Sequence, residues 1–372
     1  MKNLAGIIKS GFDNKSYAGL LKSRPDYMLP FGSRYRLVDA CLSNFNEYGI
    51  YKVLLQGDKN IKSTLDHVSN GEHWDMDLRE DGLAISVPGP EEYNSNNRRI
   101  YSYYSSISFI DEEFIDNIYI ANPMVVSRIN IESVYEDFLK NDYDVMFLYR
   151  KQEDHEGKYI DSRKVIFDED GKVQNIGVNL GTEPIFNLFM DHILIKKKVY
   201  IDLVTEALEK DNAYTLTQAI MNNKGKLSIG SYEIFNHVEY IKDLNSFYDA
   251  NINLLNEGIY TDLFLMGSGI LTKNKDEPST FYGEGNQMKN SLIANGSFIF
   301  GSIENSILFR QVHVDKDAHV KDSILFQGVI LEEGSYVENA ILDKNVIIRA
   351  GVKLIGDRHN PIVVEKNKIL EK

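Results

Sequence analysis

The sequence predicts two architectures in series: an α/β domain with a mostly parallel sheet, then a C-terminal left-handed parallel β-helix. Two patterns carry this prediction. Short apolar segments alternate with helix-period segments over the first part of the chain. A six-residue string then recurs at a spacing of seventeen residues, as Ile303–Leu308, Val320–Leu325 and Val337–Leu342.

The chain begins with a predicted β-α-β unit. Leu4–Ile8 is short and apolar, as expected for a buried parallel strand. Gly49 is placed to end the following helix, and residues 51–56 form the next predicted strand. The inward face of that helix has the spacing i, i+3, i+4 and i+7: Val38, Cys41, Leu42 and Phe45.

The same alternation continues along the α/β domain. We predict strands at Asn117–Ala121 and Val145–Tyr149, and helices at Ile131–Lys140 and from about Asp243 to Asn256. Strands that alternate with helices indicate a mostly parallel sheet covered on both faces. We place this domain at 1–256 and a linker rich in turn-forming residues at 257–287.

The repeats extend over residues 288–372, which we assign to the second domain. A looser copy of the string, Met288–Ile293, precedes the three others by fifteen residues. A period close to three hexapeptides, with single aliphatic residues and turn glycines, is typical of a left-handed β-helix whose coils stack their apolar residues in one column. The side chains predicted to point inward are Ile303, Ile307, Val320, Ile324, Val337 and Ile341.

Composition excludes several classes of partner. The net charge of −14 over 372 residues argues against nucleic acid and anionic membranes, which favour basic surfaces. No apolar run approaches the roughly 20 residues of a membrane span, and no signal peptide is evident. The single cysteine, Cys41, cannot form an internal disulfide and fits a buried core position. We therefore expect a cytoplasmic protein.

Several long strings resemble one enzyme family. These strings are 23–36, with Ser-Arg-Pro and Leu-Pro-Phe-Gly-Ser-Arg-Tyr-Arg, 71–77 (Gly-Glu-His-Trp-Asp-Met-Asp), 276–280 (Asp-Glu-Pro-Ser-Thr), 290–296 and 304–310. Together with the two architectures they resemble glucose-1-phosphate adenylyltransferase, also called ADP-glucose pyrophosphorylase. These sequence motifs are most similar to those of the D-type (GlgD-type) subunit of bacterial glycogen synthesis. The resemblance implies a Rossmann-like nucleotidyltransferase domain.

Active members of that family join ATP to glucose 1-phosphate and release pyrophosphate with the help of Mg²⁺. The resemblance implies that the parts needed for this reaction are replaced here. The Gly-Gly-x-Gly-Thr-Arg-Leu loop gives way to a longer stretch, 7–20, with two scattered glycines and no arginine. Asp26 stands in place of a lysine, and Asn122 and Tyr240 stand at the two metal aspartates. Residues 176–179 lack the Glu-Lys of the sugar-phosphate site.

We therefore expect no catalytic residue, no metal ligand and no cofactor, and a vestigial nucleotide site at Gly6, Gln56 and Asn122. Gln56 corresponds to a residue that reads adenine, although a solvent-facing loop position would explain it equally well. Arg24 and Arg36 correspond to the family's effector region, where phosphorylated metabolites bind, and Arg310 and Lys344 on the β-helix could face the same cleft, so we expect these four cations to form an anion site. The alternative for these four is separate surface ion pairs with the abundant carboxylates.

The function implied by the resemblance is that of a catalytically impaired, regulatory subunit in glycogen biosynthesis. Its expected partner is a catalytic paralogue, in a hetero-oligomer that is a tetramer as in the family. Two alternatives stay open: an active sugar-nucleotide pyrophosphorylase with divergent ligands, and a stand-alone sensor of nucleotides or sugar phosphates. A histidine base on the β-helix, as in hexapeptide acyltransferases, is a further idea for His313 or His319.

Overall fold

Strand β1 (Leu4–Ile8) lies at the centre of the first unit of the fold, with every residue buried. The computed structural model describes residues 3–10, 17–57, 60–78, 82–87, 89 and 98–371. Contact clustering divides the chain into two units, 1–11 with 40–238 and 12–39 with 239–372. This division follows packing, whereas the expected bounds at 256 and 287 follow the change in sequence character. Residues 12–39 and 239–256 thus group with the β-helix.

The sheet of the first unit is parallel in one half and mixed in the other. Within the described residues the order is β10-β9-β11-β6-β1-β4-β5, and β8 pairs with β11 and β12. β5, β4, β1 and β6 run parallel, whereas β11 runs antiparallel to β6. The other strands are β4 (Val53–Gln56), β5 (Leu83–Ser86), β6 (Asn117–Ala121), β8 (Val145–Glu153), β9 (Arg163–Phe167), β10 (Val173–Val178), β11 (Ile185–Lys196) and β12 (Ile229–Glu233), with β7 (Val125–Ser127) outside this sheet.

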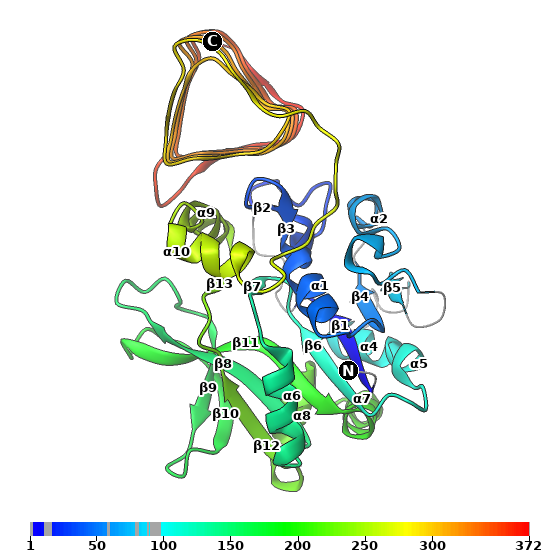
Figure 1. The fold of residues 1–372 in the computed structure, drawn as a ribbon. Coiled ribbons are helices and arrows are strands. Elements are labelled where there is room, and N and C mark those ends of the chain that lie inside the picture. Colours follow the sequence, from blue (N-terminus) through cyan, green and yellow to red (C-terminus); the bar gives the residue numbers. More distant parts are fainter. Residues whose placement is uncertain are drawn as a thin grey trace. The chain divides into compact units, whose positions relative to one another are not determined.

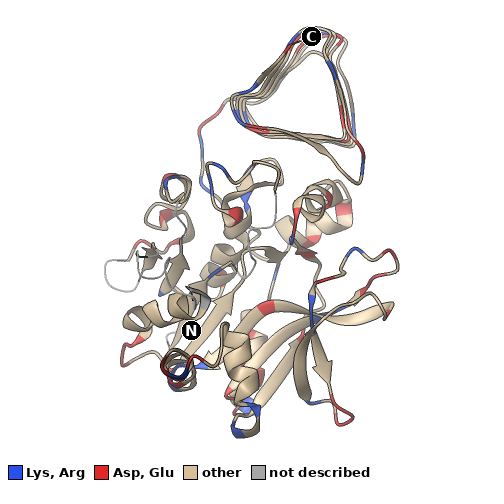
Figure 2. Cartoon of the chain, turned by 180° about the vertical axis from the view of Figure 1, so that it is seen from behind, with Lys and Arg blue, Asp and Glu red and all other residues tan. Residues whose placement is uncertain are grey.

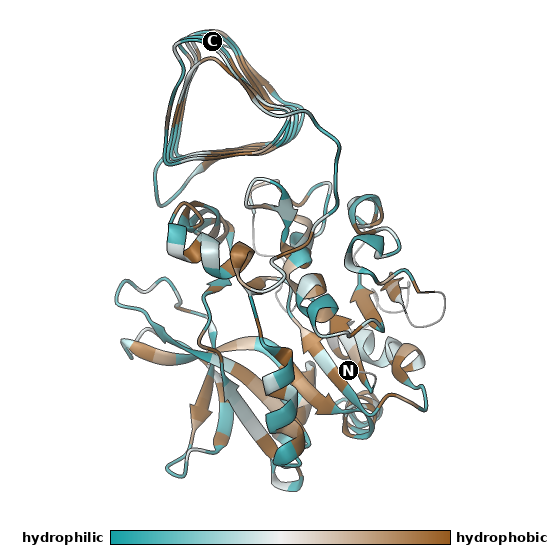
Figure 3. Cartoon of the chain, in the orientation of Figure 1, coloured by the Kyte–Doolittle hydropathy of each residue, from teal (hydrophilic) through white to brown (hydrophobic). Residues whose placement is uncertain are grey.

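Helices cover this sheet because its central strands are apolar on both sides (Figure 3). Ile7 and Ile118 of the sheet share a buried cluster with Ile100, Tyr200 and Ile220. Ile100 comes from a helix after β5, whereas Tyr200 and Ile220 come from two successive helices after β11, so the cluster joins segments distant in the chain. The helices are α1 (Leu37–Glu47), α2 (Lys62–Val68), α4 (Arg98–Ser105), α5 (Ile107–Ile110), α6 (Ile131–Lys140), α7 (Lys197–Lys210) and α8 (Leu216–Asn222), with short 3₁₀ turns at Glu72–Trp74 and Lys224–Lys226.

The predicted elements of this domain are confirmed at closely similar bounds. β1, β6 and α6 have the bounds expected from the sequence, and α1 buries the four predicted residues of its apolar face. Cys41 is part of that face, and burial raises the pKa of its thiol to about 12. These surroundings are consistent with the prediction that Cys41 is an inert residue of the core.

The second unit contains the β-helix, whose triangular coils are visible end-on in Figure 1. Three parallel sheets form its sides. One consists of β14 (Phe281–Tyr282), β17 (Phe298–Ile299), β20 (His313–Val314), β23 (Ile330–Leu331), β26 (Ile347–Ile348) and β29 (Ile369–Leu370). The second consists of β15 (Gln287–Lys289), β18 (Ser302–Glu304), β21 (His319–Lys321), β24 (Tyr336–Glu338) and β27 (Lys353–Ile355). The third consists of β16 (Leu292–Ile293), β19 (Ile307–Leu308), β22 (Ile324–Leu325), β25 (Ala340–Leu342) and β28 (Ile362–Val364).

The β-helix begins at Phe281, within the segment expected to be a linker. That segment also contains α10 (Glu257–Tyr260) and a π-helical turn, η4 (Thr261–Leu265). The remaining elements of this part of the chain are 3₁₀ helix η1 (Asp26–Met28), β2 (Pro30–Phe31), β3 (Tyr35–Arg36), β13 (Val238–Tyr240) and α9 (Leu244–Asn253). α9 starts with a capping box between Asp243 and Ser246, close to its predicted start.

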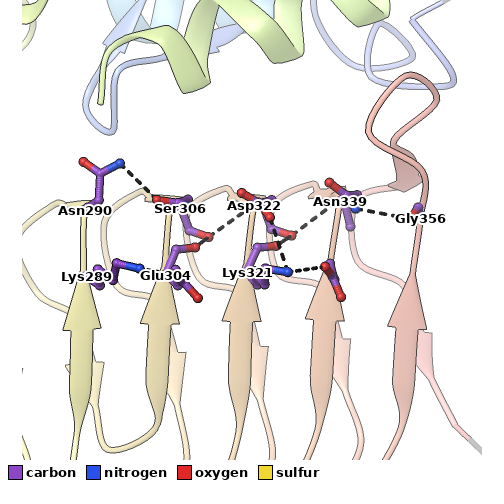
Figure 4. Close-up of polar contacts among 12 residues, drawn as sticks. Lys289, Asn290, Glu304, Ser306, Lys321, Asp322, Asn339 and Gly356 are labelled. Atoms are coloured by element: carbon purple, nitrogen blue, oxygen red, sulfur yellow. Dashed lines mark hydrogen bonds and ion pairs between the residues drawn. The ribbon is translucent and has the colours of Figure 1, made fainter. Parts of the chain in front are cut away.

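A polar ladder repeats from coil to coil at one corner of the β-helix (Figure 4). Asn305, Asp322 and Asn339 have φ angles of 47°, 42° and 48°, a left-handed turn that Asn and Asp tolerate. The next residue is serine in the first two turns, and Ser323 N–H donates to Ser306 Oγ at 3.1 Å. This tight corner repeats in register, and charged residues mark the turns of the coils (Figure 2).

Half of the predicted inward column is correct. Ile303, Val320 and Val337 belong to the buried interior cluster, but Ile307, Ile324 and Ile341 do not. Their strand neighbours Leu308, Leu325 and Leu342 point inward instead, and successive strand residues point to opposite faces. The three isoleucines are nevertheless fully buried, because α9 packs beside the outer face of this sheet. Phe247 of α9 lies 6.5 Å from Phe326 between ring centroids, and Tyr248 Oη donates to the Asp322 carbonyl at 2.5 Å.

We predict that Leu325→Ala lowers the free energy of unfolding of the β-helix by about 2–5 kcal/mol, because it opens a cavity in the interior column. Denaturant unfolding measured by circular dichroism tests this. Ile355→Ala, at a side chain 58% exposed, is the matched control and should change the stability little. Equal effects of the two variants would contradict the inward assignment.

Candidate functional site

The carboxyl end of β1 is where the resembled family places its phosphate-binding loop. Residues 11–16 of the replaced loop lie outside the described residues. Gly6 lies within β1, and a Cβ built there would come 2.6 Å from Cε2 of Phe45. Glycine at this position thus allows α1 to pack closely on the strand. This packing explains Gly6 without any ligand.

Gln56 ends β4 and is 8% exposed, so it is not the solvent-facing residue of the alternative interpretation. Its Nε2 donates to the Ser102 carbonyl of α4 at 2.5 Å. Its Oε1 is buried and has no hydrogen-bond partner among the described residues. The amide donor that could read a base edge is therefore already engaged with the protein's own backbone.

Asn122 follows β6 and is 1% exposed. Its Oδ1 accepts the Met124 N–H at 3.0 Å, so the oxygen that could face a metal ion serves a local turn. His192 lies nearby on β11, with Nδ1 3.1 Å from the Tyr119 hydroxyl. Burial lowers the pKa of His192 to about 4, against a smaller opposing contribution from the Asn122 backbone. A neutral histidine and an amide occupy this end of the sheet.

The side chains at the other replaced positions are engaged in local contacts or buried. Oδ1 of Asp26 accepts the Tyr27 N–H at 2.7 Å and so stabilises η1. Tyr240, at the second metal position, is 4% exposed. In the segment 176–179, Asn179 is fully buried and donates to the Tyr159 carbonyl at 3.1 Å. Each side chain has a role in local structure.

These donors do not fit Mg²⁺. The resemblance places carboxylates at two positions where the chain has an amide and a phenol, and hard Mg²⁺ favours carboxylate oxygens. Over residues 3–371, where described, no group of three or more His, Cys, Asp or Glu side chains is arranged to hold a metal ion.

The four predicted cations behave differently, because the structure brings them together. Arg24 is 3% exposed and donates from Nη2 to both oxygens of Asp343, at 2.7 and 3.0 Å. Its Nη1 is buried and has no hydrogen-bond partner among the described residues. Asp343 is 1% exposed and lies beside Lys344 in the chain. A bidentate pair of this kind positions the guanidinium rigidly.

Arg36 lies on β3 next to the same pair. Its Nη1 donates to the Met28 carbonyl at 3.0 Å, and its backbone N–H donates to Asp39. Burial and the neighbouring positive charge of Arg24 lower the pKa of Arg36 to about 10. The carboxylates of Asp39 and Asp343 oppose this shift only in part.

Arg310 and Lys344 supply cations from the β-helix. Nε of Arg310 lies 3.0 Å from Oε2 of Glu277, and burial lowers the pKa of Arg310. Lys344 has no ion pair to its ammonium group among the described residues. Burial, followed by the charges of Arg36 and Arg24, lowers the pKa of Lys344 to about 7.

Sequence reasoning missed four members of this cluster: Asp39, Lys275, Glu277 and Asp343. Burial lowers the pKa of Lys275, and so do the charges of Arg310 and Arg36. A signal was available, since Lys275 precedes the Asp-Glu-Pro string, Glu277 is part of that string, and Asp343 precedes Lys344. We call the eight side chains the cationic cluster: Arg24, Arg36, Lys275, Arg310, Lys344, Asp39, Glu277 and Asp343.

The cationic cluster holds five cations and three carboxylates, a surplus of positive charge in a chain of net charge −14. Arginine recognises phosphate and carboxylate in bidentate geometry, and lysine adds a point charge. The alternative of four separate ion pairs does not describe this arrangement. Chemically, the cluster suits an anion of high charge density.

The histidines of the β-helix lie elsewhere. His313 is half-buried on the outer face of its sheet, with Nε2 2.9 Å from Asp315 and its ring between those of Phe298 and Phe300. His319 is exposed and lies 6.1 Å from Tyr336 between ring centroids. Both histidines therefore lie beside aromatic side chains.

The fold and the cluster together define a class of protein: a nucleotidyltransferase-type α/β sheet joined to a hexapeptide β-helix that carries a cationic cluster. The family model described as "GlmU-like, C-terminal hexapeptide" matches residues 278–361. In the described part of the chain, no helix has the length and apolar character needed to span a bilayer.

Curated relatives narrow this class. The chain is 27% identical over 320 residues to "Glycogen biosynthesis protein GlgD" of Geobacillus stearothermophilus, covering 85% of this chain and 82% of the relative. It is also 27% identical to the protein of the same name from Bacillus subtilis, covering 86% and 82%. With "Glucose-1-phosphate adenylyltransferase" of Clostridium perfringens it shares 25% identity over 343 residues, covering 86% and 82%. The resemblance to this family, and to its GlgD-type members, is therefore confirmed.

The buried neutral His192 predicts a pH dependence of stability. Its pKa in the folded chain, about 4, is below the ordinary 6.5, so the unfolded chain binds more protons between these values. Stability should therefore fall as the pH drops from 6.5 towards 4, by roughly 1–2 kcal/mol between pH 6.5 and 5 from this residue.

Denaturant unfolding of the wild-type chain and of His192→Gln at pH 6.5 and at pH 5 measures this contribution. The variant should be less stable than the wild type at pH 6.5 but should lose less stability between pH 6.5 and pH 5. His155→Gln, at an exposed histidine, is the control. A loss on acidification as large in His192→Gln as in the wild type would overturn the assignment.

Proposed function

We propose that this chain is a subunit of a glucose-1-phosphate adenylyltransferase in glycogen biosynthesis, with a regulatory rather than a catalytic role. Its partner is a catalytic paralogue in a hetero-oligomer, which we take to be a tetramer. The observation that carries the proposal is the combination of similarity to GlgD over 85% of the chain with non-ligating residues at both metal positions. The cytoplasm is the compartment consistent with this role.

The chemistry of the reaction supports an impaired site. Adenylyl transfer requires the protein to position two anionic reactants and to neutralise the charge that crowds the transition state. Asn122 carries no charge, and its Oδ1 already accepts the Met124 N–H. Gln56 donates to the Ser102 carbonyl, and Asp26 adds negative charge where the family has a lysine. Loss of one electrostatic donor costs about 2.7–4 kcal/mol, so several losses together slow the reaction strongly.

One outer face of the β-helix supports the proposal of a partner. Six outward residues of the sheet β14-β17-β20-β23-β26-β29 lie in register, and five of them are apolar. We call them the outer column: Phe281, Phe298, His313, Ile330, Ile347 and Ile369. Phe281, Phe298 and Ile369 are 53%, 47% and 47% exposed. A flat apolar sheet face is suited to packing against a second flat face, and we infer that the paralogue binds here.

The cationic cluster supports the regulatory part of the proposal. A phosphorylated metabolite bound to it would join β3 and the preceding segment to the β-helix, because Arg24 and Arg36 come from one and Arg310 and Lys344 from the other. A ligand that binds one conformation preferentially shifts an equilibrium by its differential affinity. A subunit without activity can thus change the rate of its partner.

The first prediction of this proposal concerns catalysis. Alone, the chain should form ADP-glucose at far below the usual enzyme turnover of about 1–1000 per second. Mixed with the catalytic paralogue, it should change the paralogue's kcat, KM or effector response. A coupled pyrophosphate-release assay of each chain alone and of the mixture measures both. Full turnover by the isolated chain would instead support the active-enzyme alternative.

The outer column provides the control for this assay. Phe298→Asp should abolish the effect on the paralogue and co-elution in size-exclusion chromatography, while the isolated chain keeps its melting temperature. His319→Asp, at an exposed position on another side of the β-helix, should leave both unchanged. Tight anion binding with no effect on any paralogue would favour the stand-alone sensor.

The second prediction concerns the anion. Sulfate should bind the isolated chain, and binding should weaken as NaCl is raised from 50 to 300 mM, because salt screens the charges. Arg310→Gln should weaken binding at least tenfold, since a hydrogen bond to a charged group contributes about 1.5–3 kcal/mol. Isothermal calorimetry measures this, and Arg349→Gln, at an exposed arginine paired with Glu332, is the control. Equal affinity in the wild type and Arg310→Gln would contradict the site.

A further inference from the structure

Lys344 is a cation of the cluster that has no counter-charge of its own among the described residues. Arg24 has Asp343, and Arg310 has Glu277. The ammonium group of Lys344 makes no ion pair with any described residue, although its backbone N–H donates to Asp343 Oδ1 at 2.7 Å. Asp343 cannot compensate Lys344 as well, because both of its oxygens accept from Arg24.

The charged groups that shift the pKa of Lys344 are all cations. Arg24 and Arg36 come from the segment 12–39, and Lys275 comes from the stretch before β14. Lys366 comes from the turn between β28 and β29. Half-burial removes water that would otherwise screen these charges. A proton on Nζ is thus opposed by four cations and by the loss of solvent.

The consequence is a lysine that changes charge near neutral pH. Burial and those four charges hold the pKa of Lys344 at about 7, where an ordinary lysine has 10.5. In the ligand-free chain, Lys344 is charged below about pH 7 and neutral above it. Arg24 and Arg36 stay charged throughout this range, since guanidinium groups do not titrate there.

We propose that anion binding at the cationic cluster is coupled to proton uptake by Lys344, so that this site senses pH as well as the anion. A dianion near Arg24, Arg36 and Lys344 supplies the negative charge that the protein withholds. The lone pair of Nζ then takes one proton from solvent, and the ammonium group binds the anion. The inference rests on the anion site proposed above and is independent of the proposed partner.

The sign of the effect follows from linkage. If the bound state carries one more proton, affinity falls as the pH rises, by at most tenfold per pH unit, above about pH 7. Below pH 7 Lys344 is already protonated, so affinity should be constant. An anionic effector would therefore bind the cationic cluster more tightly at slightly acidic pH than at alkaline pH.

Isothermal calorimetry with sodium sulfate tests the proposal on the full-length chain. Sulfate remains a dianion from pH 6 to 9, so any proton exchange belongs to the protein. Titrations in two buffers of different ionisation enthalpy give the number of protons taken up. We expect close to one proton per sulfate at pH 8 and about 0.1 at pH 6.

Lys344→Arg is the decisive variant, because arginine keeps its charge at all of these pH values. It should bind sulfate with little proton uptake at pH 8 and with an affinity that no longer depends on pH. Lys353→Arg, at an exposed lysine on β27, should behave as the wild type. Circular dichroism establishes that each variant is folded.

Two results would overturn the inference. Proton uptake at pH 8 that persists in Lys344→Arg would assign the proton to another group. Sulfate binding by the wild type without proton uptake would show that Lys344 takes no part, while the anion site itself would stand. Absence of sulfate binding would remove both the inference and the anion site, but the assay with the paralogue would still decide the subunit proposal.

Discussion

The buried pair between Arg24 and Asp343 is the interaction on which the second unit depends. Both side chains are almost fully excluded from solvent, and they join residues 319 positions apart in the chain. Removing one partner of such a pair leaves an uncompensated buried charge, at a cost of about 3–5 kcal/mol. The pair therefore holds the segment around β2 and β3 against the β-helix and aligns the cations of both. The cationic cluster exists because this contact is made.

The predicted nucleotide site in the first unit and the cationic cluster in the second unit differ in the contacts of their side chains. At the sheet of the first unit, Gly6, Gln56 and Asn122 are engaged with Phe45, Ser102 and Met124 of the chain itself. In the cationic cluster, Arg24 Nη1 and the Lys344 ammonium group have no partner among the described residues. Gln56 Oε1 and Asn122 Nδ2 are also buried without a partner among the described residues, so the two sites differ in charge: Gly6, Gln56 and Asn122 are neutral, whereas the cationic cluster has an excess of cations.

Different parts of the β-helix have different structural roles. Its interior column of aliphatic residues supplies stability, and its tight polar corner sets the register of the coils. One outer face is buried beside α9, which is why Ile307, Ile324 and Ile341 are apolar although they point outward. Another outer face presents the outer column, with half-exposed phenylalanines. A repeat of single aliphatic residues does not distinguish these faces.

The sequence by itself determined the two architectures, the bounds of β1, β6 and α6, and the family resemblance, because periodicity and long motifs are local properties. It also singled out the four cations. It could not assign Ile324 and Leu325 to opposite faces, since both are apolar and only the packing of α9 and the interior column separates them. Only the tertiary structure added Asp39, Lys275, Glu277 and Asp343 to the cluster and left Lys344 without a counter-charge among the described residues. Electrostatic surroundings depend on residues distant in the chain, so only the folded chain decides which charges meet.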